Sequence, residues 1–235
     1  MKKLFGLILL MMSFMLEAQN NSEFLKHYEA YYKEMKAQGD TQGIINAMTH
    51  LNILAPSQAR KDTLAYIYMS ENKFIQALNT LGIKQNSSDS DIAVEVKAVS
   101  LKSIKRPKLA IAHFEELYKR EQDAIVAYEL AELNIQTQNL AAVDKYIDFG
   151  LANSKPKDKK AFFETQTPYE VPLKAAFMYL KAISTFSKDK KSNIDAAVDI
   201  LDATLKEAPN FNLIQITKNE LLRQKQALQN SQQSK

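Results

Sequence analysis

Apolar residues recur every three or four positions along most of the chain, which is the spacing of one face of an α-helix. Leu64, Ala65 and Tyr68 lie on one such face, and Ala77 and Leu81 lie on another. Glycine and proline, which interrupt helices, number only 5 and 6 in 235 residues. The pattern therefore predicts an all-α chain made of short amphipathic helices.

The apolar pattern repeats with a step of 33 residues. Ile44, Ala77, Ala110 and Val143 occupy the same place in successive segments, and a fifth copy centred on Ala197 follows only after 54 residues. A small residue at such a position lets two crossing helices approach closely. Five helix pairs are therefore predicted, at about residues 23–56, 57–88, 89–122, 123–152 and 171–209.

Two segments lie outside this repeat. Residues 152–172 are predicted to be an inserted loop, which either packs its apolar side chains beneath itself or forms a flap at the edge of a binding groove. Residues 212–229 have one apolar and one polar face, as a terminal capping helix requires. Residues 230–235 are predicted to be a flexible tail.

Polar residues that favour helix starts precede several of the predicted helices. Such residues satisfy the N–H groups that the first helical turn leaves without a partner. They are Ser22, Asp40, Ser57, Asp89, Asp123, Asn139 and Asn193.

The spacing resembles that of the tetratricopeptide repeat (TPR) family. The likeness rests on Leu64, Ala65, Tyr68, Ala77 and Leu81 in one copy, and on equivalent residues in the others. Those equivalents include Ala98, Leu101, Ala110, Phe114, Leu130, Ala131, Ala197, Leu201 and Pro209.

In this family a glycine usually joins the two helices of a repeat. Here Gly39 supplies it once, and Asn72, Lys105 and Gln138 stand in its place in the next copies. The resemblance implies an α-solenoid of about five helix pairs plus a C-terminal capping helix. Another α-solenoid is the alternative; ankyrin repeats share the step, but their Gly-rich turns and Thr-Pro-Leu-His start are missing.

The first 18 residues have the order of a secretory signal peptide. Lys2 and Lys3 precede a run of about 13 largely apolar residues, and Ala18 precedes the expected cleavage point. The run is shorter than the ~20 residues that span a bilayer, although an uncleaved anchor remains the alternative. We expect an exported protein, in the periplasm or else outside the cell, with no membrane span after cleavage.

Charge and residue types argue against several functional classes. The net charge of +4 is mild and its basic residues alternate with acidic ones, so nucleic acid is not an expected partner. There is no cysteine, and the three histidines have no metal-ligand spacing. No phosphate-binding loop or nucleophile elbow occurs, so we expect no metal, no cofactor and no catalysis.

The first helices of stacked pairs line the concave side of such arrays. The repeat register predicts that a partner contacts Lys33, Lys36, Tyr66, Met69, Val99, Lys102, Tyr128, Glu132 and Ile135. Phe162, Phe163 and Tyr169 of the insertion are further candidates. An ordinary solvated face is the alternative for the first set.

The leading prediction is an exported scaffold that binds a protein or peptide, within a cell-envelope complex or alone. The alternative is a glycan- or peptidoglycan-binding or enzyme-associated accessory protein that uses the 152–172 insertion. Tyr28, Tyr31 and Tyr32 bear on this choice, because they either stack on a sugar or base, or bury against the second pair.

Overall fold

The computed structural model describes residues 21–233. The predicted signal peptide at residues 1–18 lies outside these residues. Residue contacts divide the chain into two compact units, the first ending at Arg106 and the second beginning at Pro107.

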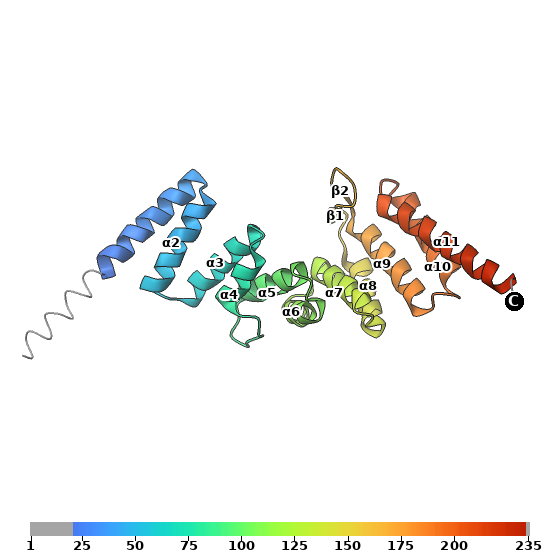
Figure 1. Cartoon of the computed structure of the whole chain (residues 1–235), viewed down its shortest axis with the longest axis horizontal. Helices are drawn as coiled ribbons and strands as arrows, with labels where there is room; N and C mark the ends of the chain where they lie inside the picture. Colours follow the sequence, from blue (N-terminus) through green and yellow to red (C-terminus); the bar gives the residue numbers. More distant parts are fainter. Residues whose placement is uncertain (1–20, 234–235) are drawn as a thin grey trace, which may run out of the picture. The chain divides into compact units, whose positions relative to one another are not determined.

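The first unit consists of helices joined by turns and, between α4 and α5, by a longer loop (Figure 1). Residues 21–38 are helical, and α2 packs against α3, α3 against α4, and α5 against both α3 and α4. The remaining helices of this unit are α2 (Thr41–Leu54), α3 (Gln58–Ser70), α4 (Phe74–Leu81) and α5 (Asp91–Ser103).

The second unit is also helical and contains the only strands within residues 21–233. Its helices are α6 (Pro107–Arg120), α7 (Ala124–Gln136), the short 3₁₀ helix η1 (Leu140–Ala142), α8 (Val143–Asn153), α9 (Leu173–Lys188), α10 (Ile194–Glu207) and α11 (Asn212–Gln233). The helical architecture predicted from the sequence is therefore confirmed.

The turns inside the first four pairs share one backbone conformation. Gly39, Asn72, Lys105 and Gln138 have φ angles of 71°, 58°, 60° and 58°, in the left-handed region that glycine adopts without strain. In each turn the following N–H donates to the carbonyl five residues earlier, as from Lys73 to Tyr68 at 2.8 Å. The three residues that replace glycine thus adopt the same turn, which closes each helix end.

Three predicted helix caps are confirmed. The side chains of Asp40, Ser57 and Asp123 accept hydrogen bonds from backbone N–H groups at the starts of α2, α3 and α7. The assignments of Ser22 and Asp89 were wrong, because Ser22 already lies within the helix of residues 21–38 and Ser90 caps α5.

Two further predicted start residues, Asn139 and Asn193, occupy the N-cap positions of η1 and α10, but they do not cap through their side chains. Their amides instead donate to Asn134 Oδ1 and to the Thr185 carbonyl.

The predicted loop at 152–172 is instead largely a β-hairpin (Figure 1). Strand β1 (Lys159–Phe162) pairs antiparallel with β2 (Tyr169–Pro172), with Lys160 opposite Val171 and Phe162 opposite Tyr169. Both strands contact α9. The hairpin gives the inserted backbone its own hydrogen-bond partners, which a loop packed on a helix would lack.

The C-terminal helix also differs from its predicted extent. Helix α11 continues to Gln233, past the predicted end of the cap at 229, so residues 230–233 are helical rather than a frayed tail. Leu221 and Ile214 on its inner face are buried, and α11 contacts α10.

Small residues lie where several helices pack closely together, and the predicted repeat alanines Ala65 and Ala77 are among them. Ala65 and Ala77 are fully buried and share a core cluster with Val96. In the second unit, Gly150 of α8 faces the ring of Phe177 from α9. These positions hold small side chains because the neighbouring element already fills the space.

Candidate binding surface

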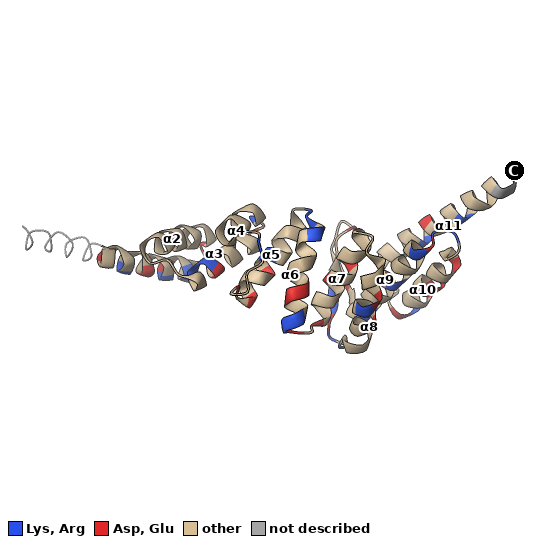
Figure 2. Cartoon of the chain, turned by 90° about the horizontal axis from the view of Figure 1, so that it is seen from below, with Lys and Arg blue, Asp and Glu red and all other residues tan. Residues whose placement is uncertain are grey.

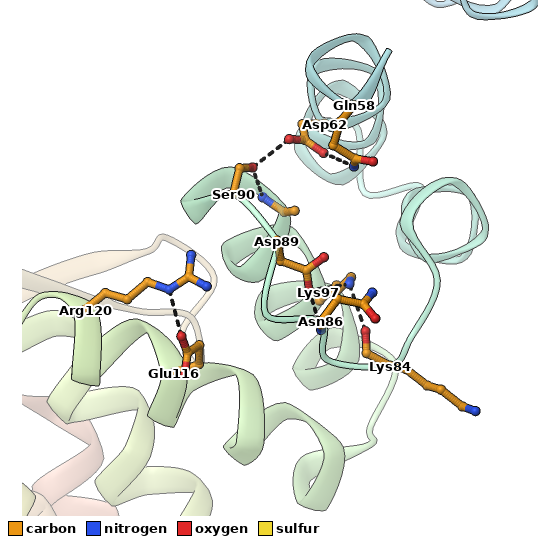
Figure 3. A network of polar contacts seen from close by, with 10 residues as sticks. Gln58, Asp62, Lys84, Asn86, Asp89, Ser90, Lys97, Glu116 and Arg120 are labelled. Atoms are coloured by element: carbon orange, nitrogen blue, oxygen red, sulfur yellow. Dashed lines mark hydrogen bonds and ion pairs between the residues drawn. The ribbon is translucent and has the colours of Figure 1, made fainter. Parts of the chain in front are cut away.

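The relative placement of α3 and α5 is fixed by a buried carboxylate (Figure 3). Asp62 of α3 accepts a hydrogen bond from the Ser90 hydroxyl at 2.6 Å and another from Gln58 Nε2 at 2.7 Å. Ser90 Oγ in turn accepts the Ala93 N–H at the start of α5. One side chain therefore ties the start of α5 to the first half of α3.

The two helices run in the same direction. Asp62 reaches Ser90, and further along α3 Ala65 packs in one cluster with Val96. Positions along α3 counted from Asp62 therefore lie beside positions along α5 counted by a similar distance from Ser90.

An apolar strip follows this contact. Tyr66 comes one turn after Asp62 and is 46% exposed, and Ile92, two residues after Ser90, is also 46% exposed. Met69 and Val99 continue the two helices and are half-buried. We call Tyr66, Met69, Ile92 and Val99 the first-helix face, because all four belong to the first helices of their pairs.

Ile92 was missed by the sequence reasoning. It lies seven residues before Val99, which is two helical turns and the same side of α5. The register that selected Val99 was sufficient to find it.

Basic side chains from residues 21–38 belong to the same unit. Lys33 and Lys36 are exposed. Arg60 Nη2 of α3 lies 3.5 Å from Glu29 Oε1, and this ion pair joins the helix of residues 21–38 to α3. Lys102, near the end of α5, is half-buried and has a polar or charged interaction within the protein.

The connection before α5 is held by a buried lysine (Figure 3). Lys97 donates to the Asp89 carboxylate at 2.7 Å and to the Lys84 carbonyl at 2.9 Å. Burial alone would raise the pKa of Asp89, but the hydrogen bonds from Lys97 and from the Asn86 N–H outweigh it and hold the pKa below its usual value. The ion pair fixes the long α4–α5 connection against α5.

In the second unit, the hairpin covers part of α7, which is the first helix of its pair. Lys160 of β1 forms an ion pair with Glu129 at 2.7 Å and places its ammonium 4.5 Å from the centre of the Tyr128 ring. Tyr128 is only 1% exposed and also meets Phe177 edge-on. Burial, and then the nearby Glu132, raise the pKa of Tyr128 well above its usual value.

Two predicted contact residues are therefore corrected. Tyr128 is not available to a partner, because Lys160 and Phe177 cover it, and Ile135 is buried as well. Glu132 is half-buried and already interacts within the protein.

The hairpin divides its aromatic residues between core and surface. Phe162 packs against Phe211, with ring centres 4.6 Å apart, and Tyr169 stacks on Phe162 at 5.9 Å. The Tyr169 hydroxyl also accepts the Leu213 N–H of α11 at 3.1 Å. Phe162 is only 9% exposed and is therefore not accessible to a partner, whereas Phe163 is 73% exposed.

The N-terminal tyrosines divide in a similar way. Tyr28 and Tyr32 pack against the core cluster of Ile45, Met48, Leu51 and Leu64. Tyr28 also stacks on His50, with ring centres 4.1 Å apart. The expectation that they bury against neighbouring helices thus holds for Tyr32, whereas Tyr28 and Tyr31 also border a surface pocket.

Within residues 21–233, no three histidine or acidic side chains gather as metal ligands would. None of the described helices is both long enough and apolar enough to cross a bilayer. Figure 2 shows basic and acidic residues interspersed along the helices.

The paired helices, their left-handed turns and the buried alanines between helices define a TPR-type α-solenoid fold. Solved structures confirm this fold class. One is a tetratricopeptide repeat protein from Parabacteroides merdae, with a TM-score of 0.64 and 15% identity, over 86% of this chain and 75% of that one. Another is YrrB, described as a TPR protein with an unusual peptide-binding site, with a TM-score of 0.65 and 11% identity, over 88% and 97%.

A third similar structure is that of MamA, with a TM-score of 0.55 and 14% identity, over 79% of this chain and 92% of that one. No family model and no curated protein matches the sequence. At these identities the likeness establishes the fold.

Proposed function

We propose that this protein is a binding scaffold that holds a peptide or protein on its first-helix face, without catalytic turnover. The observation that supports this most strongly is the exposure of Tyr66 and Ile92, each 46%, on adjacent first helices. An aromatic and a branched aliphatic side chain, both partly exposed on rigid helices, are the kind of anchor that binding energy concentrates on.

The surface is organised before any partner arrives. Asp62 fixes α5 against α3 through Ser90, and Lys97 fixes the connection that leads into α5. A partner would therefore bind without ordering these helices, which lowers the entropic cost of association.

Exposed charges of the first unit would help to orient a partner on this face. Lys33 and Lys36 are exposed in the same unit, and complementary charges speed encounter and set orientation. Because basic and acidic residues are interspersed elsewhere (Figure 2), nucleic acid is not the proposed partner.

We further propose that the protein works outside the cytoplasm, in the periplasm, and takes part in a cell-envelope assembly. This rests on the basic, apolar and small-residue order of residues 1–18. Fractionation of cells that make a tagged chain tests it: recovery in the periplasmic fraction with a shortened N-terminus is expected, and recovery only in the cytoplasm at full length would contradict it.

Affinity capture with matched variants tests the scaffold itself. The double variant Tyr66→Asp and Ile92→Asp places two charges on the first-helix face. The control Ile75→Asp changes a similarly exposed residue, 54%, on the second helix α4. Because all three positions are substantially exposed, each variant should keep its helical circular dichroism.

The expected result is a protein partner that the wild type and Ile75→Asp retain and the double variant loses. Two results would refute the proposal. One is a partner retained equally by all three proteins, and the other is the failure of the wild type to retain any partner at low salt.

A further inference from the structure

A second surface in the first unit has the features of a small-ligand site. A pocket of about 510 Å³ lies over α2, between the helix of residues 21–38 and the α3–α4 turn. This volume is in the range of ligand-binding clefts. None of its lining residues belongs to the first-helix face.

The α2 side of the pocket presents an ordered line of polar groups. Lys73 Nζ donates to Gln42 Oε1 at 3.0 Å, and Gln42 Nε2 donates to Asn46 Oδ1 at 2.9 Å. This leaves the Asn46 Nδ2 group without a hydrogen-bond partner among residues 21–233. Gln76 adds another carboxamide, so the lining offers both donors and acceptors.

Aromatic rings border the same space. Tyr28 and Tyr31 come from the first helix and Tyr68 from α3. Tyr28 is held by its parallel stack on His50, with planes 10° apart. His50 thereby covers one face of the Tyr28 ring, and the tyrosines of the lining together offer apolar ring surface beside polar groups.

The charge of the lining narrows the ligand class. Lys73 is its one lysine or arginine, and no carboxylate contributes to it. A nucleic acid would require several cations along its phosphates. A ligand with apolar C–H faces and many uncharged hydroxyl groups satisfies both the tyrosines and the carboxamides.

We propose that this pocket binds a neutral oligosaccharide, whose ring faces stack on the tyrosines and whose hydroxyl groups pair with Asn46, Gln42 and Gln76. The site is independent of the protein-binding function proposed above, because it lies on other residues of the same unit. The chain would then hold a protein and a glycan at separate places.

Saturation-transfer NMR and calorimetry with cellotriose, maltotriose and tri-N-acetylchitotriose test the proposal on the purified full chain. We expect at least one of these to bind, and Asn46→Ala and Tyr31→Ala each to weaken it by about tenfold or more. Tyr66→Ala, on the first-helix face, is the matched control and should leave the affinity unchanged.

Asn46 is exposed, so its variant should fold normally and keeps the test valid if Tyr31→Ala does not fold. Two outcomes would overturn the proposal. One is that none of the three sugars binds at millimolar concentration to folded protein. The other is that binding is the same in the wild type and in Asn46→Ala. Loss of the protein partner by the Tyr66 variants has no bearing on either outcome.

Discussion

Substitution of Gly150 by alanine should destabilise the second unit, although it places a better helix former inside α8. In an exposed helix the change from glycine to alanine raises the stability by about 1 kcal/mol. Here a Cβ atom on Gly150 would lie 1.9 Å from Cζ of Phe177 and 2.2 Å from its Cε2. Ordinary contacts of this kind begin near 3.4 Å.

The ring cannot move away easily. Phe177 is fully buried and meets Tyr128 edge-on, with ring centres 5.5 Å apart. Inserting atoms into a packed core typically costs about 1–3 kcal/mol, and this overlap is large. We therefore expect Gly150→Ala to lower the free energy of unfolding by about 2–3 kcal/mol.

Urea unfolding followed by far-ultraviolet circular dichroism measures this loss. Gly43→Ala is a useful control, because its Cβ would meet the flexible side chains of Met35 and Asp40, so the loss should be smaller. In a Phe177→Leu background the cost of Gly150→Ala should fall by about 1 kcal/mol or more. A rise in stability on Gly150→Ala would refute the packing described here.

Other changes have expected outcomes of different sign and size. Lys97→Met should lower the free energy of unfolding by about 3 kcal/mol, because it leaves the Asp89 carboxylate buried without its cation. The pKa of Asp89 is depressed, so its contribution is present above about pH 4 and is lost as pH falls through the folded-state value. Urea titrations should therefore show that the difference in free energy of unfolding between the wild type and Lys97→Met becomes smaller in acid. A difference that does not change with pH would contradict a stabilising Lys97–Asp89 ion pair. Gln138→Gly should raise stability by up to about 1 kcal/mol, because glycine relieves the φ of 58°; an equal melting temperature would argue against strain in this turn. Phe163→Ala should change the free energy of unfolding by less than about 0.5 kcal/mol, whereas Phe162→Ala should lower it by about 3 kcal/mol. Equal effects in thermal melts would contradict the division of these two rings between surface and core.

The repeat was predictable because it reflects short-range physical requirements. Helix crossings demand small residues, so Ala77 and Ala110 marked them in the sequence. The turns demand one left-handed residue each, so the position of Gly39 located Asn72, Lys105 and Gln138 at the same step. These features repeat because each helix pair meets the same local requirements.

The errors came from specific side-chain and strand pairings, which follow no period in the sequence. Asp89 and Ser90 both favour helix starts, and Lys97, eight residues on, engages Asp89 and leaves Ser90 as the cap. The strand Lys159–Phe162 has little apolar character, and it forms by pairing with Tyr169–Pro172 and packing on α9. Sequence patterns capture periodicity but not such pairings.

In the candidate site, too, the repeat register found some residues correctly and failed where the inserted hairpin packs. The register placed Tyr66, Met69 and Val99 on first helices, and the same register, extended by two turns, reaches Ile92. It also selected Tyr128, whose ring is covered by Lys160 from the inserted hairpin. Whether a register position is open depends on the insertion, which lies outside the repeat.

Site-specific photocrosslinking tests the proposed scaffold function most directly. A benzophenone amino acid would replace Tyr66 on the first-helix face in one protein and Ile75 on α4 in another, both in living cells. Ile75 is exposed at least as much as Tyr66, so reactivity alone does not favour either position. We predict one dominant protein adduct at position 66, identified by mass spectrometry and missing at position 75. The same adduct at both positions, or none at position 66, would contradict binding on the first-helix face.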